Sequence, residues 1–327
     1  MSEGRGPSRR EFLAFGAGAF VVATIPLARR RRPHVIRRTL PVMGTIAELA
    51  VVHRDERHAH AAIDAAMEEL QRVERTMTRF TATSDVGRAN LDAARGPVRV
   101  GAETALVIAE ALRWAEASGG AFDPAIGGAV ALWDVTHRHE PPPSPEVARL
   151  AGRTLWHQVE VGARGRDDVV LFHDPDARID LGAIAKGYGV DRAIDALRNR
   201  GIEHAIVDVG GDLYALGRAP DGEAWRIGIQ DPDDERGIIG EVDVADEAVA
   251  TSGTYVQFFR YRGRRYHHLL DPVTAAPRAT PQRSLTIRAD SCMHADVAAT
   301  ALFGMPIDEA TRVLAARAPG GRIVRVA

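Results

Sequence analysis

The sequence contains one lysine, Lys186, and one cysteine, Cys292, among its 327 residues. A single cysteine excludes an internal disulfide and any zinc site built from several thiolates. The other 41 of the 42 basic side chains are arginines. Where such a chain keeps a lysine, the position favours a compact ammonium that a planar guanidinium cannot replace.

Positive charge is also scarce outside the N-terminus. Residues 1–38 contain nine arginines and two glutamates, so the rest of the chain has 33 basic and 42 acidic side chains. The resulting net charge of −9 argues against a nucleic-acid-binding surface. With 45% hydrophobic and 26% charged residues, the chain has an ordinary globular composition and is long enough to bury a substantial core.

The N-terminus has the pattern of a twin-arginine export signal. Residues 8–13, SRREFL, precede an apolar, glycine-containing run over residues 14–28. Residues 26–28 match a cleavage site only weakly and four arginines follow them, so the segment could also remain as a membrane anchor. We expect residues 1–38 to be an export signal with a basic linker and residues 39–327 to be the folded domain. The protein would then lie in the periplasm or on the outer face of the cytoplasmic membrane.

The hydrophobic pattern mixes long helices with short strands. Helical spacing covers residues 57–77, 102–118, 183–200, 293–303 and 306–316. Strands are expected at residues 42–52, 157–161, 168–172, 177–180, 202–209, 212–217, 225–230, 238–244, 248–252, 284–288 and 323–326, with a hairpin over residues 255–270. Residues 81–90 and the proline run at 141–145 are expected to be loops. Because strands and helices do not alternate regularly, the pattern predicts an α+β fold with antiparallel sheets.

Lys186 lies near the start of one predicted helix, in line with the apolar residues Val190, Ala193 and Leu197. Asp180 and Gly182 precede this helix, whose N-terminal N–H groups and dipole favour an anion. The segment therefore predicts a phosphate site. A lysine whose stem packs while its amine reaches water would give the same pattern.

Asp296 and Thr300 stand four residues apart and so share one face of a predicted helix. A carboxylate and a hydroxyl are hard ligands, which suit a magnesium ion that keeps water or binds substrate phosphate. A salt-bridged Asp296 and a Thr300 bonded one turn back would explain the same spacing. His267 and His268 end a predicted strand, where neighbours face opposite ways, so at most one can point into a site as a general base.

Seven short motifs occur in a specific order, although each is weak alone. They are Met43-Gly44-Thr45, Phe122-Asp123-Pro124, Asp180-Leu181-Gly182-Ala183-Ile184-Ala185-Lys186-Gly187-Tyr188, Val207-Asp208-Val209-Gly210-Gly211-Asp212, Thr251-Ser252-Gly253, His268-Leu269-Leu270-Asp271-Pro272, and Ala295-Asp296 with Thr300. Together they resemble the ApbE family of FAD:protein FMN transferases over about residues 38–327.

The resemblance implies an ApbE-like fold and an exported, magnesium-dependent enzyme. Such an enzyme splits its substrate FAD, attaches FMN through a phosphoester to a threonine or serine of an acceptor flavoprotein, and releases AMP. The acceptors are typically exported or membrane-bound subunits of electron-transfer systems. The residues implied at the FAD site are Met43, Phe80, Ala121, Phe122, Asp123, Asp180, Lys186 and Leu270. The metal would be held by the Ala183 carbonyl, Asp296 and Thr300, with His268 as the base.

Three other functions fit the same residues. An FAD pyrophosphatase would use water as the nucleophile and give FMN and AMP. A carrier would bind FAD without turnover, and a structural protein would bind no flavin. Phe80 stands where the family often has tyrosine, which keeps the aromatic ring but loses a hydroxyl.

Overall fold

A seven-stranded, fully antiparallel sheet organises the fold. The computed structural model describes residues 34–234 and 236–327. The strand order is β1-β2-β6-β7-β10-β15-β16. The strands are β1 (His34–Val42), β2 (Thr45–His53), β6 (Ala205–Val209), β7 (Asp212–Leu216), β10 (Glu247–Gly253), β15 (Ser284–Ala289) and β16 (Arg322–Val326). Every neighbouring pair is antiparallel, as the α+β prediction requires.

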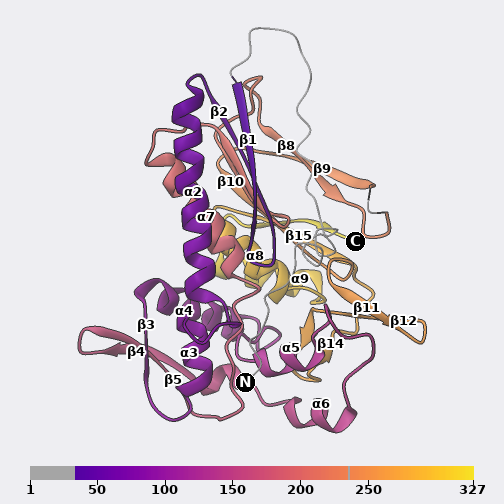
Figure 1. The fold of residues 1–327 in the computed structure, drawn as a ribbon. Helices are drawn as coiled ribbons and strands as arrows, with labels where there is room; N and C mark the ends of the chain where they lie inside the picture. Colours follow the sequence, from indigo (N-terminus) through magenta and orange to yellow (C-terminus); the bar gives the residue numbers. More distant parts are fainter. Residues whose placement is uncertain (1–33, 235) are drawn as a thin grey trace.

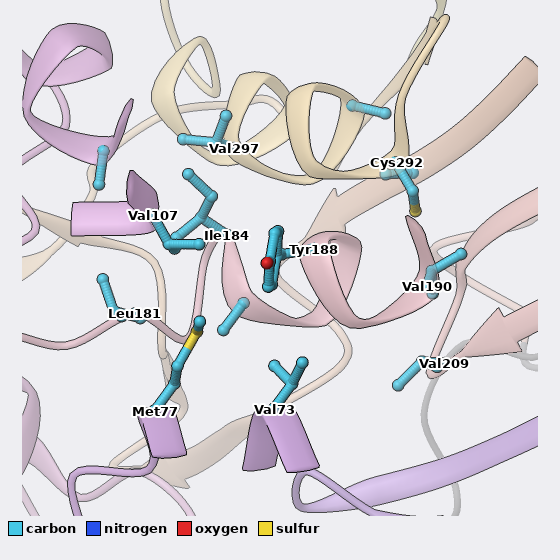
Figure 2. Packing of buried hydrophobic residues seen from close by; sticks show 14 of the residues in the cluster. Val73, Met77, Val107, Leu181, Ile184, Tyr188, Val190, Val209, Cys292 and Val297 are labelled. Atoms are coloured by element: carbon cyan, nitrogen blue, oxygen red, sulfur yellow. The ribbon is translucent and has the colours of Figure 1, made fainter. Parts of the chain in front are cut away.

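Helices cover one face of this sheet (Figure 1). They are α2 (Glu56–Met77), α7 (Ala185–Arg198) and α8 (Cys292–Ala301), with α4 (Ala102–Ala117) and α9 (Ile307–Arg317) beyond them. Alternate strand residues such as Val207 and Ala250 point into the core beneath the helices. Figure 2 shows α7 between α8 and α2, with Tyr188 of α7 lying between α8 and Val73 of α2.

The opposite face of the sheet is covered by a hairpin of β8 (Trp225–Gln230) and β9 (Ile238–Val244). Trp225 and Ile227 pack there against Ile206 and Val249, which are out of phase with the helix-facing residues. The central strands are therefore buried on both faces. This burial explains why they read as almost continuous apolar runs in the sequence.

Smaller elements surround the sheet and its helices. They are α3 (Asp85–Asp92), β3 (Val98–Val100), α5 (Gly127–Trp133), α6 (Ser144–Leu150), a 3₁₀ turn at Leu155–Gln158, β4 (Val159–Arg164), β5 (Asp167–Phe172), β11 (Phe258–Tyr261), β12 (Arg264–His267), β13 (Leu270–Asp271) and β14 (Ala276–Pro277). The order β3-β5-β4 forms one small sheet, while β11-β12 and β13-β14 are two-stranded. A separate apolar cluster around Trp133 and Phe259 joins α5, α6 and these last hairpins.

The long elements agree with the sequence prediction, but four local expectations were wrong. Residues 81–90 contain the start of α3, because Ser84 caps that helix by accepting the N–H of Gly87. The proline run is a loop at residues 141–143, as expected, but its last two residues begin α6, where proline fits the first turn. Residues 177–180 form a loop with one isolated bridge, from Ile126 to Arg178, in place of a strand. The strand expected at residues 42–52 begins only at Thr45, as β2, after a turn at Met43 and Gly44, and β1 before that turn was not expected.

The N-terminal boundary also differs from the expected one. β1 begins at His34, so residues 34–38, which the sequence assigned to the basic linker, are paired in the sheet. The predicted export signal itself lies in residues 1–33, outside the described part of the chain. Within the described part, none of the helices combines the length and apolarity needed to cross a bilayer.

Candidate active site

Three charged side chains from three elements meet at the start of α7. The Lys186 Nζ atom lies 2.6 Å from the Asp212 Oδ2 atom of β7 and 3.1 Å from the Asp296 Oδ1 atom of α8. The carboxylate side chains are each 4% exposed and the lysine side chain is 26% exposed. We call these three residues the lysine cluster. Its single ammonium faces two carboxylates, so the cluster has excess negative charge.

Burial and charge act in opposite directions on this cluster. Burial alone would lower the pKa of Lys186, but Asp212 and Asp296 raise it above its ordinary value. Burial raises the pKa of Asp212 above its usual range, and the Asp296 carboxylate raises it further. Lys186 therefore stays an ammonium at neutral pH. Its carboxylate partners were not evident from the sequence, and they count against the alternative of an amine that reaches freely into water.

Helices α7 and α8 each accept hydrogen bonds from the other's N-terminus. The Gly187 N–H donates to Asp296 Oδ2 at 3.0 Å, while the Cys292 and Met293 N–H groups donate to Asp191 at 2.8 and 2.9 Å. The helices approach so closely that a Cβ on Gly187 would lie 2.2 Å from the Cys292 carbonyl oxygen. Asp296 is thus fixed at a helix N-terminus, where a carboxylate is stabilised.

The loop before α7 forms one rim of the cluster. Asp180 accepts the Gly182 N–H at 2.8 Å and pairs with Arg79 at 2.8 Å. The Gly182 carbonyl accepts a bond of 3.3 Å from Lys186. Arg79 also lies over the ring of Phe80, 4.3 Å from its centre, and Phe80 is 79% exposed. The structure therefore joins Asp180 and Phe80 through Arg79 and leaves an aromatic face open to a ligand.

Met43 lies at the same end of α7. Met43 and Gly44 both have positive φ, of 53° and 72°, in the turn between β1 and β2. This left-handed geometry is costly for methionine, and the bond from its N–H to Glu74 Oε1 at 2.7 Å helps to hold it. The Met43 thioether packs over Gly189, where an added Cβ would lie 3.3 Å from the sulfur. Met43 therefore lies one helical turn from Lys186.

The chemistry of the nearby side chains limits which ligands a metal could have. Among the described residues, no group of three or more His, Cys, Asp or Glu side chains is placed to bind a metal. A cation would therefore need backbone or hydroxyl oxygens in addition to a carboxylate. The predicted ligands, the Ala183 carbonyl, Asp296 and Thr300, are of these kinds. Thr300 lies 2.9 Å from the Ser252 hydroxyl, to which it can donate its proton while its lone pairs stay available. The excess negative charge of the lysine cluster also fits a bound cation.

The two neighbouring histidines have different environments. His267 is buried, donates from Nε2 to the Arg278 carbonyl at 3.2 Å and packs edge-on to Phe303. His268 is half-buried and donates from Nδ1 to the Gln257 carbonyl at 3.3 Å, which leaves Nε2 as the proton acceptor. Burial lowers the pKa of His268 to about 4, so the imidazole is neutral at pH 7.

Four other predicted residues contribute mainly through packing and backbone. Asp123 is buried and accepts the N–H groups of Ala125 and Trp156 at 2.7 and 3.1 Å, and burial raises its pKa to about 6. Phe122 and Leu270 are buried in separate apolar clusters. The Ala121 carbonyl accepts a hydrogen bond from Arg278. Ala121, Phe122 and Asp123 belong to the loop whose Pro124 carbonyl accepts the Asp180 N–H at 2.8 Å.

Sequence reasoning assigned no role to four residues that the structure places in or beside the site. Asp212 and Ser252 lie inside recognised motifs, so the motif was the available signal. Arg79 and Arg278 belong to no motif. Arg278 donates to the carbonyls of Ala121 and of Phe303, which lies just after α8. Ala121 is 157 residues from Arg278 in the sequence, and no local pattern indicates such a contact.

Comparison with known proteins identifies the family of the chain. The model of the ApbE family matches residues 43–323. The FAD:protein FMN transferase of Treponema pallidum is 33% identical over 87% of this chain and 83% of its own length. The enzyme of the same name from Vibrio cholerae is 33% identical over 84% of each chain.

Solved structures show the same fold. The ApbE protein of Thermotoga maritima superposes with a TM-score of 0.80 at 28% identity, covering 90% of this chain and 96% of its own. The flavin transferase ApbE of Vibrio cholerae gives a TM-score of 0.75 at 29% identity, covering 89% and 92%. The chain therefore belongs to the ApbE family. The resemblance seen in the ordered motifs and the α+β fold class are both confirmed.

Proposed function

We propose that this protein is an FAD:protein FMN transferase that joins FMN by a phosphoester bond to a threonine or serine of an acceptor protein and releases AMP. The observation that carries the proposal is the lysine cluster. It places one ammonium and two buried carboxylates at the N-terminus of α7, beside an exposed aromatic side chain. The names of the relatives from Treponema pallidum and Vibrio cholerae support the same activity.

FAD would bind along the rim that the structure assembles. Phe80 and Met43 offer apolar surface to the flavin or adenine, and the N–H groups at the start of α7 favour the pyrophosphate. Lys186 would contribute positive charge to the same phosphates once FAD competes for it with the two carboxylates. The Asp123 loop would fix the position of this rim by its bond to Asp180.

The transfer step requires removal of one proton. The acceptor hydroxyl oxygen forms a bond to the phosphorus of the FMN half, and the bond from that phosphorus to the bridging oxygen breaks. AMP leaves with the bridging oxygen and its electron pair. His268 would take the hydroxyl proton at Nε2, since its Nδ1 proton is engaged with Gln257. An anionic substrate beside His268 would raise its pKa towards neutrality and strengthen it as a base.

We propose magnesium as the resident metal, held by the Ala183 carbonyl, Asp296 and Thr300. When bound, it would neutralise negative charge on the pyrophosphate oxygens. Two of the residues that would hold it are themselves fixed by hydrogen bonds: Asp296 by Gly187 and Thr300 by Ser252.

The cellular setting is part of the proposal. Residues 8–28 support export by the twin-arginine route, so the enzyme would act in the periplasm or on the outer face of the cytoplasmic membrane. Its acceptors would be exported or membrane-bound flavoprotein subunits of electron-transfer systems. If the N-terminal segment is not cleaved, it would also hold the enzyme on the membrane.

The test combines the full chain with FAD, magnesium and an exported flavin-carrying acceptor domain. Flavin fluorescence is measured on the denatured acceptor band, and AMP is measured in the same sample. We expect a fluorescent acceptor and an equal amount of AMP, both lost when magnesium is chelated. Free FMN and AMP without labelled acceptor would indicate the pyrophosphatase. Bound FAD with no AMP would indicate a carrier.

A further inference from the structure

The hairpin of β11 and β12 is a basic segment on an acidic body. Residues 248–270 contain no aspartate or glutamate, yet Arg260, Arg262, Arg264 and Arg265 all lie in the hairpin. Among the described residues, none of these four arginines makes an ion pair with a carboxylate. Arg260, Arg262 and Arg264 are exposed. We call these four residues the arginine hairpin.

Two of these arginines are placed against each other. Arg260 and Arg265 are directly opposite in the antiparallel register, and both guanidinium groups lie over Phe258, at 5.7 and 4.4 Å from its ring centre. Like charges in this position destabilise a strand pair. Arg265 Nη1 is also buried without a hydrogen-bond partner in the described structure. The two guanidinium groups repel each other, and an anion bound between them would offset that repulsion.

The other face of the hairpin is firmly anchored. Tyr266 stacks on Phe259 at 5.1 Å and on Trp133 of α5 at 5.6 Å, in an apolar cluster of its own. The hairpin is therefore a fixed projection from the body (Figure 1). Within residues 34–234 and 236–327, the hairpin's sheet has only two strands, so the outer edge of each strand is unpaired there and an extended segment can pair with it.

The open end of the hairpin lies at His268, the candidate base. This end is closed by the bond from the His268 N–H to the Gln257 carbonyl, at 3.1 Å. His268 in turn is close enough to Lys186 for the ammonium to influence its pKa. A polypeptide lying along the hairpin would therefore reach the site where its hydroxyl is to be deprotonated.

We propose that the arginine hairpin docks an acidic segment of the acceptor protein and so presents the acceptor's hydroxyl to His268. This proposal rests on the proposed transferase function, because it identifies the surface that recognises the protein substrate. Carboxylates of the segment would pair with the unpaired guanidinium groups, which are suited to bidentate contacts. The acidic body would repel the same segment elsewhere.

The chain offers a matched control. The turn between β4 and β5 has the sequence Arg164-Gly165-Arg166, which repeats the Arg262-Gly263-Arg264 of the arginine hairpin. Its arginines are also exposed, but Glu160, Asp167 and Asp168 are in the same hairpin, and Figure 1 shows it on the other side of the molecule. R262Q/R264Q and R164Q/R166Q therefore make the same chemical change at two places.

The experiment measures binding by fluorescence anisotropy with a labelled peptide that has one threonine among glutamates and alanines. All proteins are full-length and have Arg29 to Arg32 changed to glutamine, so that this run of four arginines cannot compete, and the remaining N-terminal arginines are the same in every variant. We expect R262Q/R264Q to weaken binding about three- to tenfold, and R164Q/R166Q to leave it unchanged. A peptide with lysines in place of glutamates should not bind, and salt should weaken the parent protein more than R262Q/R264Q.

Equal binding by both double variants would overturn the proposal, as would equal binding of the glutamate and lysine peptides. Hairpin-dependent binding to phosphatidylglycerol vesicles without binding of the acidic peptide would also overturn it, in favour of a membrane surface. Flavin transfer to the peptide is measured in the same samples. Charge-dependent binding without transfer would support the docking surface and count against the transferase function alone.

Discussion

Helix α8 contributes to two buried charge clusters of opposite composition. Towards α7, the lysine cluster sets one ammonium against the carboxylates of Asp212 and Asp296. Towards α4 and α9, Glu110 accepts from Arg113 at 2.8 Å and from Arg317, and lies 3.5 Å from His294. We call Glu110, Arg113, His294 and Arg317 the glutamate cluster.

The two clusters are similarly buried but differ in which charge is in excess. The Glu110 side chain is 9% exposed, against 4% for Asp212 and Asp296. Burial alone would raise the pKa of Glu110, but its hydrogen bonds from His294, Arg113 and Arg317 lower it to about 2. In the lysine cluster, one cation cannot offset two carboxylates, and the pKa of Asp212 stays raised.

This difference separates a structural cluster from a functional one. The glutamate cluster needs no further partner, because its one carboxylate has more cations than it requires. The lysine cluster lacks positive charge, and buried excess charge is costly unless something compensates it. A magnesium ion or another cation would supply that charge, so ligand binding and catalysis are expected at the cluster that is incomplete. Four predictions test this distinction.

The largest effect is expected for D296N in the lysine cluster. Asparagine can still accept the Gly187 N–H, but the cluster loses the charge that is proposed to hold the metal. We expect the rate of flavin transfer to fall about 10²- to 10³-fold with little change in melting temperature. The rate is measured as fluorescent acceptor over a magnesium titration. D308N, at an exposed site on α9, is the control, and an unchanged rate in D296N would refute the assignment.

K186R should have the next largest effect although it conserves charge. The compact ammonium contacts two carboxylates and the Gly182 carbonyl from one point, a geometry that the planar guanidinium cannot reproduce. We expect turnover or FAD affinity to fall about tenfold or more, measured by FAD titration and steady-state kinetics. R192K, the reverse exchange on the same helix, should retain activity. Wild-type kinetics in K186R would remove the argument from the single lysine.

The helices and the lysine cluster show how much of the structure the sequence can predict. Long helices such as α2 and α7 were predicted because their buried faces repeat every three to four residues. α5 was missed because it has only seven residues and is held by a cluster that includes Leu270, far along the chain. Lys186 stood out by its rarity. Its pairing with Asp296, 110 residues away, follows only from the packing of α7 on α8.

E110Q should destabilise the glutamate cluster without affecting transfer. It leaves Arg113, Arg317 and His294 without their shared carboxylate, at an expected cost of about 2 kcal/mol in the free energy of unfolding. Since the folded-state pKa of Glu110 is lowered to about 2, its stabilisation is full above the unfolded pKa near 4.5 and is lost as the pH falls through about 2. Denaturant unfolding should therefore show wild type and E110Q converging in acid. E116Q, exposed on the same helix, should follow wild type throughout, and an activity loss in E110Q that exceeds its loss of folded protein would contradict the distinction.

The smallest effect is expected beside the lysine cluster, at Asp208, and has the opposite pH dependence. Burial raises the pKa of Asp208 to about 8, with Asp212 adding to the shift. The folded state then binds a proton that the unfolded state has lost, so this residue makes stability fall as the pH rises from about 4 to about 8. Asparagine can keep the bond from the Gly211 N–H, and D208N should gain about 1 kcal/mol over wild type at pH 8 and little at pH 4. D221N changes an exposed aspartate that accepts the Glu223 N–H in a similar turn, and its unfolding profile should stay parallel to wild type. If the stability difference between D208N and wild type does not grow with pH, the comparison fails. Excess negative charge would then not distinguish the lysine cluster and its surroundings from the glutamate cluster.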